Sequence, residues 1–243
     1  MTIPVRPVDV PASVRELARR EGLGTGHAVW LNQLGGLTFA YPDVGQFVKW
    51  VPHHPEFDVV DEAARLDWAG RFTTVPAVID LGSDEHGAWL RTRAVPGRSA
   101  VHPRWIAEPR IAVRAIGTGL RSFHDRLPVL DCPFDWSLAT RFAWIKRDED
   151  RVLIEQAPPI DRLVVCHGDM CAPNTLLDEA GAFTGHVDLG RLGVADRWAD
   201  LAVATYSLGW NYDGEWTDEL LDAYGIERDD DRIGYYRRLW DAT

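Results

Sequence analysis

The sequence lacks any hydrophobic run that approaches the roughly 18 residues needed to cross a bilayer. The opening MTIPVRPVDVPASVRELARR also lacks the continuous apolar segment of a secretory signal, so we expect a cytoplasmic protein with no membrane partner. Cysteine is scarce: Cys132, Cys166 and Cys171 form neither a C-x-x-C pair nor a zinc-ligand pattern. The sequence therefore favours buried or bystander thiols over a disulfide scaffold or a metal centre.

Lysine is scarcer still, and the C-terminal third contains none. The chain has two lysines, Lys49 and Lys146, against 24 arginines. From His167 onward there are 6 Arg and 16 Asp plus Glu, so this third carries nearly all of the net charge of −11. Such a surface would repel nucleic acid and attract a cationic small molecule. A merely solvated acidic surface explains the charge equally well.

Enough apolar material is present for a full core. With 243 residues, 46% hydrophobic content and 11 Trp, the chain can form one large domain or two small lobes. Turn signals separate hydrophobic runs in the first 95 residues, which predicts strands over 27–40, 46–51, 75–82 and 88–95. Between the second and third runs, a helix is expected because apolar and acidic positions recur at helical spacing: Val59, Glu62, Leu66 and Ala69.

A hinge at 96–99 separates this strand-rich lobe (1–95) from a larger, mainly helical lobe (96–243), which makes an α+β, bilobal chain. Residues 108–126 place their apolar side chains mainly along one helical face. We interpret His124 in this helix as a hydrogen-bonded core residue and not as a catalyst. Further on, Thr217 is expected to cap a helix that stops at Gly225, and 231–241 to form the last helix.

Two strands in the C-terminal lobe each end on a carboxylate. RLVVC leads into His167-Gly168-Asp169, and FTGHV leads into Asp188-Leu189-Gly190, with Asn174 between them. If the two strands are neighbours, the oxygens of Asn174 and Asp188 meet at their ends and suit Mg²⁺, a hard ion that keeps phosphate and water as its other ligands. Asp169 is then left to face a hydroxyl group.

The spacing agrees with the H-x-D-x-x-x-x-N and D-x-G motifs of kinases. Asn174 lies five positions after Asp169, and Asp188 lies 14 positions after Asn174. In the N-terminal lobe, Lys49 lies on an expected strand and Glu62 on the next helix, the elements that supply a phosphate-binding lysine and its ion-pair partner. The alternatives are two ordinary Asx turns with a capping asparagine, and a solvated lysine on a strand edge.

CHGDMCAPN and GHVDLGRLGVADRWADLA resemble the aminoglycoside phosphotransferase family, which has a protein-kinase-like fold. AVPGRSA, DCPF and AYGIERDDDRIGYYRRLW resemble its hinge, a landmark after the long helix and its C-terminal segment, so most of the chain is covered. The resemblance is closest to the branch that phosphorylates the 3′ or 3″ hydroxyl. It implies that Asp169 is the catalytic aspartate and that Asn174 and Asp188 hold Mg²⁺.

The same resemblance implies a nucleotide site and an acceptor site. ATP would lie between the lobes, with its phosphates on Lys49, which Glu62 pairs, and its adenine stacked on Phe47; the hinge residue Ala94 also belongs to this site. Gly35 and Gly36 would let backbone N–H groups approach phosphate. Arg191 matches a family residue near the substrate; its alternative is a salt bridge to Asp196 or Asp200. Asp241 and Thr243, with its terminal carboxylate, could bind amines.

The sequence departs from the family between Asp131 and His167, where relatives have an extra helical insertion that helps form the aminoglycoside pocket. At its end, relatives usually carry an acidic pair and a terminal aromatic residue. We therefore expect an ATP- and Mg²⁺-dependent kinase of aminoglycosides, a monomer or weak homodimer with a small cationic hydroxylated substrate. The alternatives are a kinase of another sugar or amino alcohol and a nucleotide-binding pseudokinase. Trp210, Tyr212 and Trp216 could support substrate rings or belong to the core.

Overall fold

The computed structural model describes residues 4, 8–32, 34–55, 58–145, 147–153 and 156–243. Lys146 lies outside this description. The chain divides into two compact units. The first comprises residues 1–70 and 76–94, and the second comprises residues 71–75 and 95–243.

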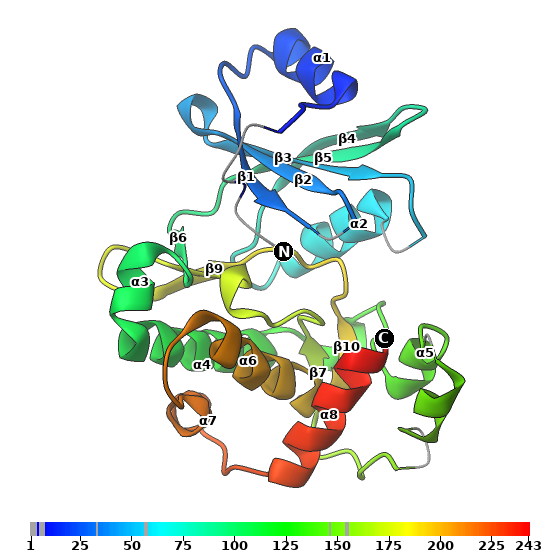
Figure 1. The fold of residues 1–243 in the computed structure, drawn as a ribbon, viewed down its shortest axis with the longest axis vertical. Coiled ribbons are helices and arrows are strands. Elements are labelled where there is room, and N and C mark those ends of the chain that lie inside the picture. The colour runs from blue at the N-terminus through cyan, green and yellow to red at the C-terminus, as the bar shows by residue number, and fades with distance from the viewer. Residues whose placement is uncertain (1–3, 5–7, 33, 56–57, 146, 154–155) are drawn as a thin grey trace. The chain divides into compact units, whose positions relative to one another are not determined.

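Five antiparallel strands form the sheet of the first unit, in the spatial order β1-β2-β3-β5-β4 (Figure 1). The strand expected over 27–40 is two strands joined by a short loop, in which residue 33 lies outside the described residues. The other expected strands are confirmed within two or three residues. The bounds are β1 (His27–Leu31), β2 (Leu37–Tyr41), β3 (Gln46–Pro52), β4 (Val78–Ser83) and β5 (Gly87–Arg93), with a 3₁₀ turn η1 (Pro42–Val44) before β3.

Helices α1 (Ala12–Glu21) and α2 (Val59–Ala69) complete the first unit. The sequence analysis did not predict α1, which buries Val14 and Leu17 in a cluster with Val48 of β3. Helix α2 was predicted, and it contacts β4 and β5. Because side chains alternate along a strand, Val48 faces the α1 cluster and Lys49 faces the opposite side of the sheet.

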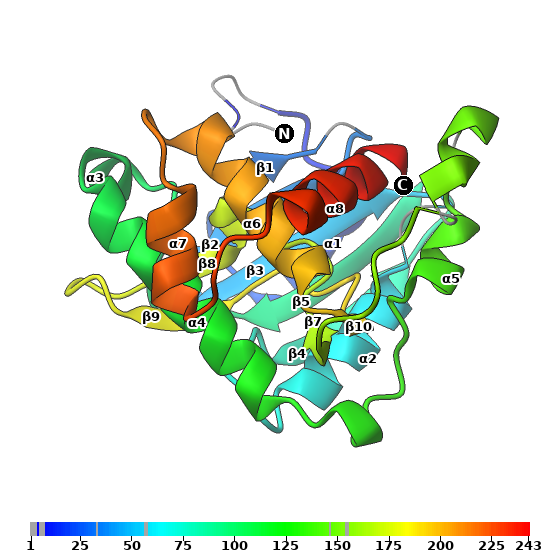
Figure 2. The same ribbon diagram turned by 90° about the horizontal axis from the view of Figure 1, so that it is seen from below.

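The second unit is mainly helical (Figure 2). Its long helix α4 packs against α7, and α6 packs against both α7 and α8. The predicted helices at 108–126, 217–224 and 231–241 are confirmed, but Thr217 is the first residue of α7 and does not cap it, since no side-chain cap is formed there. The bounds are α3 (Pro103–Ala107), α4 (Pro109–Arg126), α5 (Leu138–Phe142), α6 (Trp198–Asn211), α7 (Thr217–Tyr224) and α8 (Asp230–Ala242).

Two small sheets bring the motif loops together. Strand β7 (Leu163–Cys166) pairs with β10 (Gly193–Asp196), and β9 (Phe183–His186) pairs with β8 (Thr175–Leu177), which also pairs with β6 (Arg98–Ser99). The expectation that RLVVC and FTGHV form neighbouring strands is therefore wrong. Each strand instead pairs with a short strand that carried no strong sequence signal. Three further 3₁₀ turns complete the unit: η2 (Val129–Asp131), η3 (Asp148–Leu153) and η4 (Ala172–Asn174).

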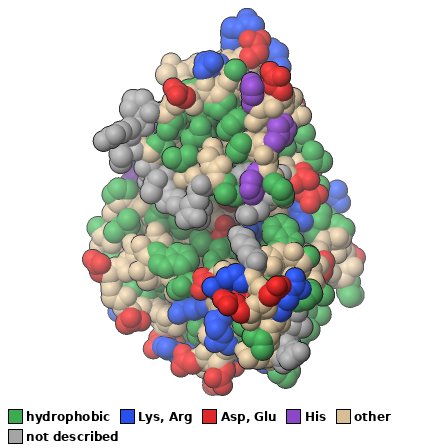
Figure 3. Space-filling model, turned by 45° about the vertical axis from the view of Figure 1, so that its right-hand side comes forward, with side chains coloured by type: hydrophobic (Ala, Val, Ile, Leu, Met, Phe, Trp, Pro, Cys, Tyr) green, Lys and Arg blue, Asp and Glu red, His purple; other side chains and the backbone are tan. Residues whose placement is uncertain are grey.

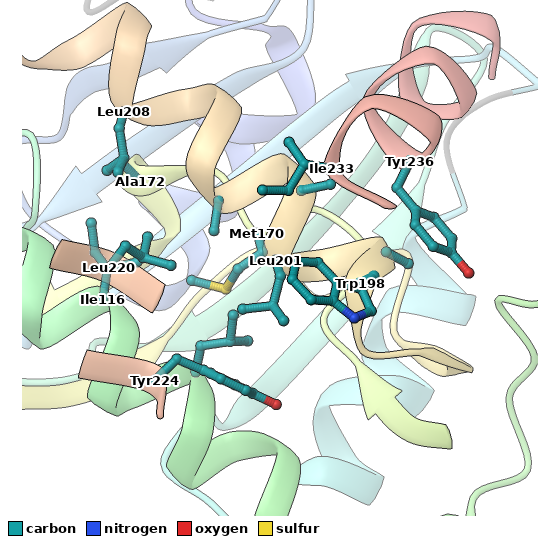
Figure 4. Packing of buried hydrophobic residues seen from close by; sticks show 14 of the residues in the cluster. Ile116, Met170, Ala172, Trp198, Leu201, Leu208, Leu220, Tyr224, Ile233 and Tyr236 are labelled. Atoms are coloured by element: carbon teal, nitrogen blue, oxygen red, sulfur yellow. The ribbon is translucent and has the colours of Figure 1, made fainter. Parts of the chain in front are cut away.

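The core of the second unit lies directly behind the motif loop. Met170, which follows Asp169, is fully buried in the same cluster as Ile116, Leu201 and Tyr224 (Figure 4). Burying a side chain of this size contributes about 1.5–3 kcal/mol, which ties the loop to the helices. The three cysteines form no disulfide; Cys166 and Cys171 are buried and Cys132 is half-buried.

The surface is charged and mixed. Acidic and basic side chains lie beside one another on the face shown in Figure 3. Several acids of the C-terminal third are bound by arginines, for example Glu219 by Arg110 and Arg114. No helix within the described ranges is long and apolar enough to span a bilayer.

Candidate active site

The first unit holds the predicted lysine and glutamate together. Lys49 Nζ lies 2.8 Å from Glu62 Oε2, with both side chains largely buried. Asp58 caps α2 by accepting from the N–H groups of Val60 and Asp61, and this cap fixes the first turn that carries Glu62. Strand β3 lies between β2 and β5, so a lysine on a strand edge is excluded. The result is a compact cation aligned by a carboxylate, the chemistry that suits phosphate.

Phe47 lies on the same side of β3 as Lys49, two residues before it, and is half-buried. Ala94, at the end of the first unit, donates its N–H to the carbonyl of Gly45 at 2.9 Å. These residues were predicted from family resemblance, and the structure brings Phe47 and Lys49 to one face of one sheet.

The glycine loop is closed on an asparagine that the sequence analysis did not single out. Asn32 Oδ1 accepts from the N–H groups of Leu34, at 3.0 Å, and Gly36, at 2.7 Å. Gly35 has a φ of +84°, which favours glycine, and its N–H points to the Asn32 carbonyl. An anion would have to compete with Asn32 for these donors.

The motif loop of the second unit is held by its own backbone and side chains. Asp169 donates its N–H to His167 Nδ1 at 3.2 Å, and its carbonyl accepts from Asn174 Nδ2 at 2.8 Å. His167 Nε2 lies 2.9 Å from the Val187 carbonyl, and the Val187 N–H bonds to the Asn174 carbonyl. Asp169, Asn174 and the residue before Asp188 thus form one bonded unit, although their strands are not neighbours.

Glycine at 168 is required by both conformation and space. Its φ is +84°, and a Cβ at this position would lie 2.1 Å from the Arg191 carbonyl oxygen. Asp188 has a φ of 64°, and among the described residues it is the one non-glycine with a positive φ. Backbone strain of this kind, on the order of 1–3 kcal/mol, is found where a side chain must be held at a particular point.

Asp169 carries the most unusual electrostatics of the site. Its Oδ1 is buried, and no group among the described residues hydrogen-bonds to it. Burial, and then the nearby charge of Asp188, raise the pKa of Asp169 above its usual value. Burial and Asp169 likewise raise the pKa of the Cys171 thiol well above its usual range, so this thiol stays protonated. The loop holds an acceptor oxygen without a donor beside a second carboxylate.

Arg191 is surrounded by aromatic rings. Its guanidinium carbon lies 5.5–5.6 Å from the ring centres of Trp136, Trp144 and Trp240. Asp196 bonds to Arg232, and Asp200 bonds to His124, so the alternative of a salt bridge from Arg191 to either aspartate is wrong. Arg191 instead acts on Asp169, whose pKa it lowers in part. The three tryptophans were missed because Trp240 lies far along the chain from Trp136 and Trp144, and all three come together only around the guanidinium.

The two C-terminal candidates lie in different surroundings. Asp241 is exposed, and its Oδ2 lies 3.5 Å from the Tyr206 hydroxyl. Thr243 is buried, and its hydroxyl donates to the Leu239 carbonyl and accepts from the buried Arg141. The Thr243 hydroxyl is therefore committed within the protein. Of the aromatics that could support a substrate, Tyr212 belongs to the core and Trp210 is exposed.

A family model described as the phosphotransferase enzyme family matches residues 47–236. This chain belongs to that family. Among its relatives, an aminoglycoside 3′-phosphotransferase of Streptomyces fradiae is 37% identical over 82% of this chain and 85% of its own length. A streptomycin 3″-kinase of Streptomyces griseus is 32% identical over 87% of this chain and 90% of its own length.

Solved structures agree with this phosphotransferase along almost its whole length. An aminoglycoside phosphotransferase of the 3″ type from Streptomyces rimosus covers 96% of this chain and 97% of its own, with a TM-score of 0.76 and 28% identity. A structure of the same enzyme in complex with ADP and streptomycin gives a TM-score of 0.73 at 27% identity, over 96% of this chain and 99% of its own. The α+β, kinase-like fold expected from the sequence is confirmed.

Proposed function

We propose that this protein transfers the γ-phosphoryl group of ATP to a hydroxyl group of an aminoglycoside, at the 3′ or 3″ position. The observation that carries this proposal is the buried, unpartnered Oδ1 of Asp169 beside Asp188. A carboxylate oxygen in this state is ready to accept a hydrogen bond from an acceptor hydroxyl. Relatives named for 3′- and 3″-phosphorylation support the acceptor class.

Asp169 would orient the hydroxyl and take up its proton as the bond to phosphorus forms. Because the transition state of phosphoryl transfer is loose, alignment and charge neutralisation contribute more than proton abstraction. Lys49, aligned by Glu62, would bind the phosphates, with Phe47, Ala94, Gly35 and Gly36 in the nucleotide site. The first unit is thereby assigned to nucleotide binding and the second to catalysis and acceptor binding.

The donor set of the second unit fits Mg²⁺. The Asn174 amide nitrogen is used in its bond to the Asp169 carbonyl, which leaves the amide oxygen as the atom that can bind a cation. We assign Asn174 and Asp188 as the residues that would hold the ion. When bound, Mg²⁺ neutralises charge on the phosphates.

Arg191 and Asp241 are our candidates for the acceptor side, together with the carboxylate of Thr243. An exposed carboxylate such as that of Asp241 suits a protonated amine of the substrate. Since the reaction consumes ATP, we place the enzyme in the cytoplasm.

The first test is an acceptor panel. The purified protein is incubated with Mg²⁺-ATP and kanamycin, neomycin, streptomycin or neutral sugars, and products are identified by mass spectrometry. We expect a phosphorylated aminoglycoside that is absent with Asp169→Asn. Phosphorylation of sugars alone would assign another acceptor and point to the short 131–167 segment as the cause. ATP binding without any product would favour a pseudokinase.

A further inference from the structure

A buried network lies behind the motif loop and is not used by the reaction as described so far. Its centre is Asp200, in the first turn of α6, whose side chain is fully buried. Asp200 Oδ2 accepts from the His167 N–H at 2.6 Å, and Oδ1 accepts from the Gly168 N–H at 2.9 Å. Asp200 therefore holds the backbone N–H groups of the two residues that immediately precede Asp169.

His124 of α4 supplies the third hydrogen bond of Asp200. Its Nε2 lies 3.0 Å from Asp200 Oδ2, and its Nδ1 lies 2.9 Å from the Tyr224 hydroxyl. Burial raises the pKa of Tyr224 to about 12, so its hydroxyl keeps its proton at neutral pH and can donate to Nδ1. The remaining ring proton of a neutral His124 then lies on Nε2 and points to Asp200.

The network keeps Asp200 charged. Burial alone would raise the pKa of this carboxyl, but hydrogen bonds from His124 and from the backbone help to bring it below its usual value. A charged acceptor binds backbone N–H groups more strongly than a neutral one. The strength of the hydrogen bonds from the His167 and Gly168 N–H groups to Asp200 therefore depends on the donors that stabilise the Asp200 carboxylate.

A metal centre is the competing explanation of the cluster, since ligand atoms of His124, Cys166 and Asp200 lie within 4.8 Å of one another. Both Asp200 oxygens and both His124 nitrogens are already hydrogen-bonded. Burial raises the pKa of the Cys166 thiol well above its usual range, so it stays protonated and is a poor metal ligand. Hydrogen bonding accounts for the cluster without an ion.

We propose that His124 is a positioning residue for phosphoryl transfer: by donating to Asp200 it holds the His167-Gly168 peptides and so sets where the Asp169 carboxylate lies. This inference rests on the proposed function. It extends the interpretation of His124 as a hydrogen-bonded core residue, because the same bonds that satisfy the imidazole also align the loop.

Two amide variants separate positioning from simple packing. In His124→Gln the amide nitrogen can take the place of Nε2 and donate to Asp200. In His124→Asn the shorter side chain can still reach the Tyr224 hydroxyl but not Asp200. We expect kcat of the Gln variant within about threefold of wild type, and kcat of the Asn variant about 10- to 100-fold lower, because small misplacements of reacting groups are costly. The KM for ATP should stay within about twofold in both, since Lys49 and Glu62 are untouched.

A spectroscopic measurement tests the same bonds without an acceptor. The backbone amide protons of His167 and Gly168 should resonate downfield in wild type and the Gln variant, as expected for short bonds to a carboxylate, and move upfield in the Asn variant. Unmoved amides with wild-type kcat in a folded Asn variant would overturn the inference. If wild type phosphorylates nothing in the panel while the amides respond, the proposed function fails and the network stands.

A third variant covers the case in which the Asn variant does not fold. Tyr224→Phe removes the donor to His124 Nδ1 and leaves the ring itself in place. We expect a kcat several-fold lower than wild type with a smaller upfield shift of the two amides. Wild-type kcat and unchanged amides in Tyr224→Phe would then overturn the proposal.

Discussion

Glu62 and Asp169, one in each unit, are carboxylates in contrasting states. Glu62 lies 2.8 Å from the Lys49 ammonium, which compensates its burial. Asp169 has a buried oxygen that no described residue binds, and it lies close enough to Asp188 for that charge to raise its pKa. The first unit holds Lys49 and Glu62 as an ion pair, whereas the second keeps a carboxylate oxygen, Asp169 Oδ1, to which no described residue hydrogen-bonds.

The difference indicates how each group is used. A lysine that is expected to bind phosphate is aligned in advance by its counter-ion. A carboxylate that must meet a hydroxyl has to keep its oxygen available, so it cannot be satisfied within the protein. The unfavourable burial of an unbonded carboxylate oxygen therefore occurs at the position where the acceptor is expected to react.

The largest effects are expected from substitutions of the two neighbouring carboxylates, Asp169 and Asp188. Asp169→Asn keeps the shape and removes the charge, and we expect kcat to fall by about 10²–10⁴-fold, as for loss of a general base. Asp188→Ala should abolish turnover through loss of the proposed Mg²⁺ ligand. Turnover is measured as ADP release with the best acceptor, and a rate near wild type in either variant would refute that residue's role.

A smaller effect is expected from breaking the satisfied pair. Lys49→Met should lower kcat/KM about 100-fold, chiefly through ATP, and leave Glu62 buried without its cation. Removing the cation that pairs with a buried carboxylate costs about 1–3 kcal/mol, which urea unfolding would detect. In the double variant Lys49→Met/Glu62→Leu we expect most of the stability to return but not the activity. Equal instability of the single and double variants would contradict this account of the pair.

Asp169→Asn should also stabilise the protein. Because the pKa of Asp169 in the folded state lies above its ordinary 3.8, the native state loses stability as the pH rises through that interval. The variant should therefore be more stable than wild type at pH 7, with a higher Tm. This gain should vanish as the pH falls toward 3.8. A Tm difference that does not change with pH would show that relief of charge is not its origin.

The smallest effect is expected from breaking an exposed ion pair, which serves as a control for the buried pair of Lys49 and Glu62. Arg19 and Glu16 on α1 also form an ion pair, at 2.6 Å, but both side chains are exposed. Solvent and salt screen such pairs, so Arg19→Ala should leave Tm and kcat unchanged within error. A loss comparable to that of Lys49→Met would mean that ion pairing alone, without burial, decides these effects.

The motif residues could be predicted because local spacing carries them: Lys49, Glu62, Asp169, Asn174 and Asp188 each lie on the expected element or at its end. The predictions that failed concerned contacts between residues that are distant in the sequence. The short strands β8 and β10 carry too few residues for a periodic signal, so the pairing of β7 and β9 was misassigned. Helix α1 was missed because it buries only Val14 and Leu17, too few apolar residues for a clear helical pattern.

Some parts of the site could not be predicted from local patterns at all. The tryptophans around Arg191 come from segments up to about a hundred residues apart, and the role of Asn32 depends on a loop closing on itself. The partners of His124 lie 76 and 100 residues away in the chain. Contacts of this range follow from tertiary packing, which overrides local preference.

The protonated thiol of Cys171 has a consequence for chemical intervention. It lies within hydrogen-bonding range of Asp169, yet its raised pKa leaves almost no thiolate to attack an electrophile. Covalent inhibitors built around cysteine-reactive warheads should therefore find no handle in the reaction centre. Half-buried Cys132 is the position where such a reagent would attach.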